Sequence, residues 1–180
     1  SVMDRGFIFG DGIYEVVPVY AGRPFRLASH FSRLARSLRE VRIENPLTDT
    51  QWRAVVEELV SRYANMTDKP AATLNQLIYI QVTRGVAMRD HVMPEGIAPT
   101  VFAMVNSLKD IPDSHVTAGV RCITAEDFRW EKAHIKSTSL LGAVLSRQMS
   151  ADVGALETIM FRDGKLSEAA ASNVWVVKDG

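Results

Sequence analysis

Apolar and polar residues along the chain form patterns that predict both strands and amphipathic helices. Residues 12–20 are rich in β-branched and aromatic side chains, which predicts a strand, and Pro18 indicates a sheet edge or a bulge. From Leu27 to Val41, apolar residues recur at three- and four-residue spacing, which predicts a helix with Ser29 as its N-cap. The chain is therefore expected to open with a strand and a helix.

A second helix and several strands are expected next. Thr48 or Asp49 can cap a helix whose apolar positions run from Trp52 to Tyr63, and a polar loop is expected at 65–72. Apolar runs bounded by turn signals predict the following strands: 74–84, 100–106, 116–125 and 158–161, the last leading through Asp163-Gly164 into a hairpin partner.

The last part of the chain is predicted to contain one more helix and one more strand. Residues 137–151 are expected to form a helix whose apolar side chains, from Leu140 to Met149, face inward. The apolar run 174–177 is typical of a strand, and the turn signal at 179–180 has no second strand after it. We therefore expect the chain to be part of a longer protein.

The order of these elements favours an α+β fold. Helices come early, and short links between strands favour a mostly antiparallel sheet in an α+β sandwich. We expect an N-terminal α+β domain at residues 1–125. Residues 126–180 are expected to form a linker and the beginning of a C-terminal domain.

Composition excludes several classes of protein. Lys plus Arg and Asp plus Glu are both 21, so no basic excess points to nucleic acid or an anionic membrane. The single cysteine, Cys122, excludes an internal disulfide and a CxxC site. The chain lacks an apolar run of the ~20 residues that cross a bilayer and a signal peptide, which favours a cytoplasmic protein. The four histidines lack metal-ligand spacing, so no metal site is predicted.

Lys136 is the first candidate for catalytic chemistry. It lies between Ile135 and the hydroxyl residues 137–139, which can cap the predicted helix and would place the lysine at the helix N-terminus. Partial burial and a helix N-terminus both disfavour the ammonium form, and a lysine with a lowered pKa can form a Schiff base. The alternative is a lysine whose charge simply extends from the helix start to solvent.

Three further features could take part in binding or catalysis, and each also has a simpler structural explanation. Small residues around Glu168 allow a flat group to approach, although strand-end carboxylates are common. Arg89 and His91 are two residues apart, so in an extended loop both can face one anion, although charged loops are usually just solvated. Arg33 lies on a basic helix face, which by itself indicates only a polar surface.

Taken together, these residues resemble a known family, the fold-type IV pyridoxal-phosphate aminotransferases, and within it the D-amino-acid transaminases. The resemblance covers essentially the whole chain, and its motifs occur in the same order and spacing. They are DRGFIFGDGIYEVVPVYAG (4–22), SHFSRL (29–34), YIQVTRGVAMRDH (79–91), HIKSTSLLGAVL (134–145) and LSEAAASNVWVV (166–177). The resemblance implies a two-domain α+β enzyme, with an N-terminal α/β sandwich domain and the start of a larger β-rich domain.

The resemblance also implies roles for individual residues. Lys136 matches the lysine that carries pyridoxal 5'-phosphate, and Glu168 matches the carboxylate at its pyridine nitrogen. The chain departs from its relatives at 169–171, where alanines replace hydroxyl residues and the first hydroxyl is Ser172. The other implied roles are cofactor binding by Arg33, Ser172 and Asn173, and binding of the substrate carboxylate by Tyr14, Arg89 and His91.

The implied activity is transamination between a D-amino acid, such as D-alanine, and a 2-oxo acid, such as 2-oxoglutarate. Relatives are homodimers in which the loop carrying Arg89 and His91 reaches the partner's active site. That pair separates D-amino-acid transaminases from branched-chain aminotransferases and aminodeoxychorismate lyase. Branched-chain or (R)-amine transaminase, the lyase, and a non-catalytic α+β binding domain remain as alternatives.

Overall fold

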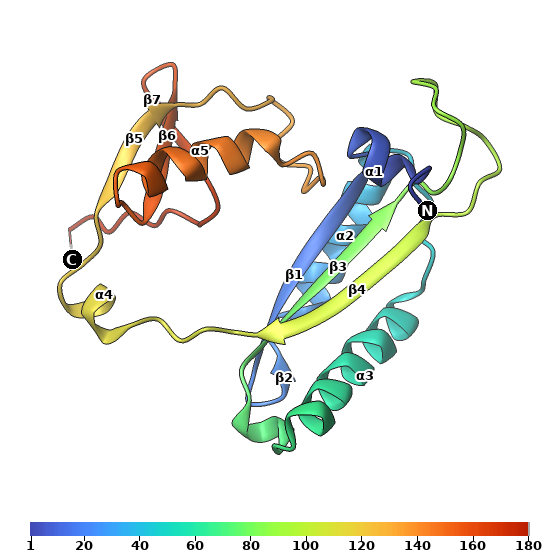
Figure 1. Cartoon of the computed structure of the whole chain (residues 1–180), viewed down its shortest axis with the longest axis horizontal. Helices are drawn as coiled ribbons and strands as arrows, with labels where there is room; N and C mark the ends of the chain where they lie inside the picture. The colour runs from blue at the N-terminus through green and yellow to red at the C-terminus, as the bar shows by residue number, and fades with distance from the viewer. Residues whose placement is uncertain (180) are drawn as a thin grey trace. The chain divides into compact units, whose positions relative to one another are not determined.

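The structure is a computed structural model that describes residues 1–179 and divides the chain into two compact units (Figure 1). The first unit comprises residues 1–109 and 134–139, and the second comprises 110–133 and the described residues from 140 onward. The domain boundary expected after residue 125 therefore falls inside the second unit, and residues 134–139 return to the first.

The first unit is a four-stranded antiparallel sheet with the strand order β2-β1-β3-β4. The long pairing of β1 with β3 runs from Gly12 opposite Thr83 to Val19 opposite Gln76. Its elements are α1 (Arg5–Phe9), β1 (Gly12–Tyr20), β2 (Arg23–Pro24), α2 (Leu27–Glu40), α3 (Asp49–Thr67), the 3₁₀ turn η1 (Ala71–Thr73), β3 (Gln76–Thr83) and β4 (Thr100–Ser107).

The core of the first unit lies between the sheet and two helices. Along β1, the side chains of Ile13, Val17 and Val19 are fully buried, because alternate residues of a strand face the same side. α2 and α3 contribute their apolar faces to the same cluster, including Leu34 and the fully buried Trp52. The predicted amphipathic helices are thus confirmed, and they leave the other face of the sheet without a helix from this unit.

The ends of the two helices differ from the prediction in detail. Thr48, one of the two predicted caps, caps α3 in a capping box with Gln51, but α3 continues to Thr67 into the expected polar loop. Ser29 is wrong as the N-cap of α2. The helix begins at Leu27, directly after Arg26 (φ 50°), whose left-handed backbone is not helical.

The second unit contains a three-stranded sheet with the order β5-β6-β7 and helix α5 beside it (Figure 1). β5 and β6 are parallel, and β6 and β7 form the predicted hairpin. Asp163 and Gly164 have φ values of 51° and 72°, the left-handed conformation that a tight hairpin turn requires. The elements are α4 (Asp113–Thr117), β5 (Cys122–Glu126), α5 (Leu141–Asp152), β6 (Glu157–Arg162) and β7 (Lys165–Ala169).

Three predictions for this region are wrong. The strand expected at 116–125 begins only at Cys122, because α4 occupies 113–117. The segment 174–177 forms no strand in the described chain. The apolar side chains of α5 predicted to face inward are exposed, from Leu140 to Met149.

Small polar residues, rather than leucines, form the packed face of α5. Ser146 and Ser150 are fully buried and lie one helical turn apart. The backbone oxygen of Ser146 accepts a 2.7 Å hydrogen bond from the Thr158 hydroxyl of β6, which requires close approach of helix and strand. Among the described residues, no helix is both long and apolar enough to cross a membrane.

Candidate active site

The segment around Lys136 pairs with β1 instead of starting a helix. The Lys136 carbonyl accepts a 2.9 Å hydrogen bond from the Tyr14 backbone, and the Thr138 backbone donates to the Gly12 carbonyl at 2.9 Å. The Thr138 hydroxyl donates to the Gly10 carbonyl, so it does not cap α5. The predicted helix N-terminus at Lys136 is therefore wrong, because these hydroxyls bond to residues at the start of β1.

Gly10 allows this close approach. It ends α1 with a φ of 65°, a left-handed conformation that glycine adopts without strain. A side-chain carbon at Gly10 would lie 2.6 Å from the Ser139 hydroxyl oxygen, which is closer than two such atoms can approach. The absence of a side chain at Gly10 therefore allows the Lys136 segment to pack against the start of β1.

The structure brings Lys136 and Tyr14 together. The Lys136 Nζ lies 4.2 Å from the centre of the Tyr14 ring, a cation–π contact. Tyr14 also stacks on Tyr79 of β3, with ring centres 5.5 Å apart. Burial and the neighbouring Tyr14 raise the pKa of Tyr79, whose hydroxyl donates to Gln81 at 2.7 Å. The amine thus lies over an aromatic surface on the sheet face that the helices do not cover.

Arg33 is held by a carboxylate that the sequence analysis missed. Glu15 of β1 is 1% exposed, and its two oxygens accept hydrogen bonds of 2.6 Å from Nε and Nη2 of Arg33. His30 Nδ1 lies 2.8 Å from the same carboxylate. The signal was present, since Glu15 is an acidic residue in the buried register of an otherwise apolar strand.

The charges in this cluster stabilise one another. Burial alone would raise the pKa of Glu15, but the hydrogen bonds with Arg33 and His30 outweigh it and lower that pKa. The hydrogen bond to Glu15 raises the pKa of Arg33. The third guanidinium nitrogen, Nη1, makes no hydrogen bond with the described residues, and the side chain is 40% exposed. Arg33 is thus fixed on one edge and available to an anion on the other.

Arg89 and His91 lie on the same aromatic ring, that of Phe9. The Arg89 guanidinium carbon is 5.3 Å from the ring centre, and the His91 ring centre is also 5.3 Å away. Both residues are exposed on the loop that joins β3 to β4. The structure therefore brings the predicted anion-binding pair together, and it adds Phe9, which the sequence analysis did not single out.

Glu168 belongs to the second unit, where it pairs with Arg129. Glu168 lies in β7 with its side chain 50% exposed, and its Oε2 is 3.1 Å from Nη1 of Arg129. Asp127 binds the other two nitrogens of that guanidinium at 2.9 and 3.0 Å. The hydrogen bond from Arg129 holds the pKa of Asp127 far below its ordinary value. The sequence analysis named Glu168 but neither of these partners.

The segment after Glu168 uses its polar groups internally. Ala169 and Ala170 are buried, so the departure from relatives at these positions places methyl groups in the packed part of the second unit. The Ser172 hydroxyl donates to Oε2 of Glu157 at 2.6 Å, and Asn173 is exposed. Ser172 and Asn173 belong to the second unit, whereas Lys136 and Arg33 belong to the first.

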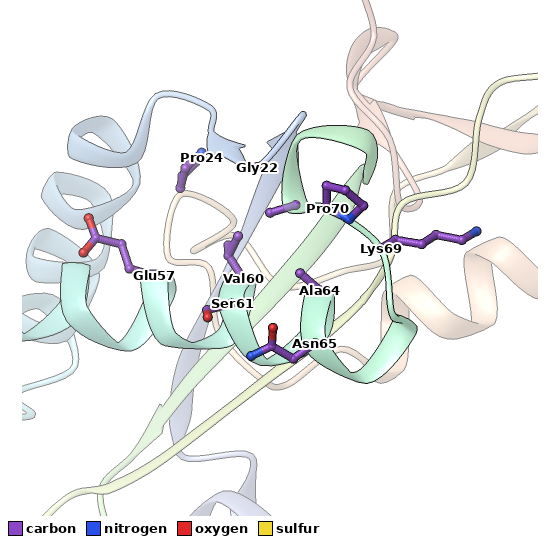
Figure 2. A pocket seen from close by; sticks show the side chains of 10 residues that line it. Gly22, Pro24, Glu57, Val60, Ser61, Ala64, Asn65, Lys69 and Pro70 are labelled. Carbon is purple, nitrogen blue, oxygen red and sulfur yellow. The ribbon is translucent and has the colours of Figure 1, made fainter.

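A surface hollow of about 350 Å³ lies away from these residues (Figure 2). Figure 2 shows it between α3, which contributes Val60 and Ala64, and the turn at Gly22 and Pro24. None of the predicted site residues lines it. Within residues 1–179, no group of three or more His, Cys, Asp or Glu side chains could hold a metal ion.

The fold and these residues define a class of enzyme. Residues 12–180 match the family described as "Amino-transferase class IV", so the chain belongs to the class IV aminotransferases. It is 38% identical to the D-alanine aminotransferase of Staphylococcus aureus (strain N315) over 185 residues, which covers 100% of this chain and 61% of that protein. The chain thus spans about three fifths of the length of that relative.

Solved structures agree with the family. A fold IV-transaminase from Curtobacterium pusillum superimposes with a TM-score of 0.83 at 25% identity, covering 100% of this chain and 61% of that one. A hypothetical aminotransferase from Mycobacterium tuberculosis, solved in a PLP-bound form, has a TM-score of 0.75 at 24% identity, covering 94% and 59%. The fold-type IV architecture expected from the sequence is confirmed.

Proposed function

We propose that the protein is a pyridoxal-phosphate-dependent transaminase that moves an amino group between a D-amino acid, such as D-alanine, and a 2-oxo acid, such as 2-oxoglutarate. The observation that carries this proposal is the placement of Lys136 over the Tyr14 ring. Backbone hydrogen bonds fix that placement, and it joins an amine to a residue expected to bind the substrate carboxylate. The similarity to D-alanine aminotransferases along the whole chain supports the choice of substrate.

The residues present fit pyridoxal phosphate chemically. Lys136 offers a half-buried amine, and Arg33 offers an accessible guanidinium edge for a phosphate. Glu168 offers a half-exposed carboxylate that can accept a hydrogen bond from a pyridine N–H. When bound, the cofactor supplies an electron sink for the negative charge that develops at the substrate Cα.

The chain's own residues would bind, orient and move protons. Lys136 would take the proton from the substrate Cα as a general base and deliver it, as a general acid, to the reactive carbon of the cofactor. Glu168 would hold a proton on the pyridine nitrogen, and its ion pair with Arg129 orients the Glu168 carboxylate. Glu15 holds Arg33 in the rotamer that presents Nη1 to the phosphate.

Selectivity for the D-enantiomer would come from the residues that hold the α-carboxylate. Tyr14, Arg89 and His91 fix that group on one side, which decides which Cα substituent faces Lys136. The resemblance to homodimeric relatives implies that Arg89 and His91 act in the partner subunit's site, and both residues are exposed on their loop. The dimer, its shared site, roles for Ser172 and Asn173, and a cytoplasmic location stay predictions of this proposal.

A substrate panel tests the proposal. The whole protein, loaded with pyridoxal phosphate, is offered D-alanine, L-leucine or aminodeoxychorismate, each with 2-oxoglutarate. We expect pyruvate and glutamate from D-alanine at the highest kcat/KM. Faster turnover of L-leucine would contradict the D-amino-acid assignment. Pyruvate that forms from aminodeoxychorismate even when 2-oxoglutarate is left out would identify a lyase. A protein that takes up no pyridoxal phosphate would support a binding domain instead.

A further inference from the structure

The loop that carries Arg89 and His91 has little regular structure of its own. Between Thr83 and Thr100, the backbone forms one isolated bridge, from Val86 to Asp4. Side chains on such a loop ordinarily sample many rotamers, and ordering two of them at once lowers binding affinity. Something must therefore hold the pair in place if it is to grip one carboxylate.

Residues at and before α1 hold the start of this loop. The Arg5 backbone donates to the Gly85 carbonyl at 2.9 Å, and the Ala87 backbone donates to Met3 at 3.3 Å. The Arg5 guanidinium also donates through Nη1 to the carbonyl of Asp90, the residue between Arg89 and His91. The backbone at the centre of the pair is thus tied to a side chain that is 4% exposed.

Arg5 is itself fixed by a buried ion network. Its Nε lies 2.8 Å from Oδ2 of Asp11, and the same carboxylate binds Arg84 through bonds of 2.8 and 3.0 Å. Arg84 stands at the beginning of the loop and donates further to the carbonyls of Val41 and Arg42. The Asp11 carboxylate therefore connects Arg5 of α1 to Arg84 at the start of the loop.

Phe9 at the end of α1 completes the arrangement. Its ring centre lies 4.6 Å from the Arg5 guanidinium carbon, 5.3 Å from that of Arg89 and 5.3 Å from the His91 ring. A ring contacted by these three groups limits the rotamers of Arg89 and His91 together. A cation over an aromatic face is attracted by the ring quadrupole, which adds to the restraint.

We propose that Phe9 is a positioning residue for substrate-carboxylate recognition: its ring holds the Arg89 guanidinium and the His91 imidazole side by side, while Arg5 fixes the backbone between them. This inference rests on the proposed function, in which Arg89 and His91 bind the α-carboxylate. Phe9 touches neither substrate nor cofactor in this scheme and acts only through the pair.

The test compares Phe9→Leu and Phe9→Tyr in the whole, cofactor-loaded protein. Leucine keeps apolar bulk but removes the ring, whereas tyrosine keeps the ring. We expect Phe9→Leu to raise KM for D-alanine about tenfold with kcat within about twofold. The carboxylate is bound equally in the substrate complex and in the transition state, so losing that binding affects KM and not kcat. Phe9→Tyr should restore a KM close to that of the wild type.

A control on the same helix separates positioning from a general effect on α1. Phe7 is 77% exposed, and Phe7→Leu should change neither constant. The melting temperature of each variant is measured without cofactor, and it should stay close to that of the wild type. A readout independent of turnover is the dissociation constant of propanoate, which Phe9→Leu should raise about tenfold, with no matching change for propylamine.

Two results would overturn the inference. One is an unchanged KM for D-alanine and an unchanged propanoate affinity in Phe9→Leu. The other is an equal loss in Phe9→Leu and Phe9→Tyr, because the ring would then not be the part that matters. If the wild-type protein transfers no amino group from D-alanine, the proposed function fails, while the propanoate comparison still decides the role of Phe9.

Discussion

Replacing Arg33 should destabilise the protein more than replacing its buried partner, Glu15. Glu15 is 1% exposed, whereas the side chain of Arg33 is 40% exposed. Removing Arg33 leaves a buried carboxylate whose remaining side-chain partner among the described residues is His30. Removing the carboxylate instead leaves a guanidinium that water can reach. The free energy of unfolding should therefore respond asymmetrically to the two changes.

The magnitudes follow from which charge is left behind. Arg33→Met should lower the free energy of unfolding by about 3–5 kcal/mol, the usual effect of breaking a buried ion pair from one side. Glu15→Gln keeps the shape and one acceptor oxygen, so it should lower it by about 1–3 kcal/mol, the range for one charged hydrogen bond. The exposed pair of Glu58 and Arg62 is the control, where Glu58→Gln should change stability by at most about 0.5 kcal/mol.

The assay is urea unfolding of the cofactor-free protein at pH 7, repeated at lower pH. The pKa of Glu15 is lowered in the folded state, so its contribution is complete above the ordinary glutamate pKa of about 4.3 and is lost as pH falls through the folded pKa. In Arg33→Met the Glu15 carboxyl should take up its proton at a higher pH than in the wild type. The difference in the free energy of unfolding between the two proteins should therefore shrink as the solution is acidified.

The reasoning is refuted by one simple outcome. If Glu15→Gln lowers the free energy of unfolding at pH 7 as much as Arg33→Met, then burial of the carboxylate does not decide the energetics of this pair. A difference between wild type and Arg33→Met that grows toward acid pH would reverse the predicted sign and lead to the same conclusion.

Three further predictions concern the reaction. Glu168→Gln should still bind pyridoxal phosphate, but kcat should fall far more than cofactor affinity; a near-normal kcat would remove Glu168 from its role. Arg129→Gln should lower kcat less than Glu168→Gln, and it should also lower the melting temperature because Asp127 loses the partner that holds it ionised; unchanged kcat and melting temperature would contradict this. Mixing Arg89→Ala with Lys136→Ala subunits should restore activity if the loop acts in the partner's site, and no recovery in exchanged dimers would place Arg89 elsewhere.

Local patterns predicted the strands and helices whose signals lie within one segment. β1 matches its predicted range, and Thr48 was one of the two predicted caps of α3; its partner Gln51 is only three residues away. The hairpin at Asp163-Gly164 was equally local, since both residues favour the left-handed conformation that the turn requires. These features depend on the spacing of neighbouring residues, which can be read directly from the sequence.

The site could be predicted only in part, because its contacts join distant segments. The position of Lys136 depends on hydrogen bonds to β1, more than 120 residues earlier, and periodicity instead suggested a helix start. The packed face of α5 could not be chosen from the pattern, since Ser146 and Ser150 pack while its leucines do not. Phe9 escaped notice because nothing local links an aromatic residue on a short helix to a loop after β3.

Reductive labelling of the cofactor-bearing lysine tests the central claim most directly. The chain contains six lysines, and within residues 1–179 Lys136 is the one whose amine lies over an aromatic ring, at 4.2 Å. After loading with pyridoxal phosphate, borohydride reduction and peptide mapping, the account predicts a label on Lys136, retained in Lys132→Ala and lost in Lys136→Ala. A label on any other lysine, or none in a protein that has taken up the cofactor, would contradict it.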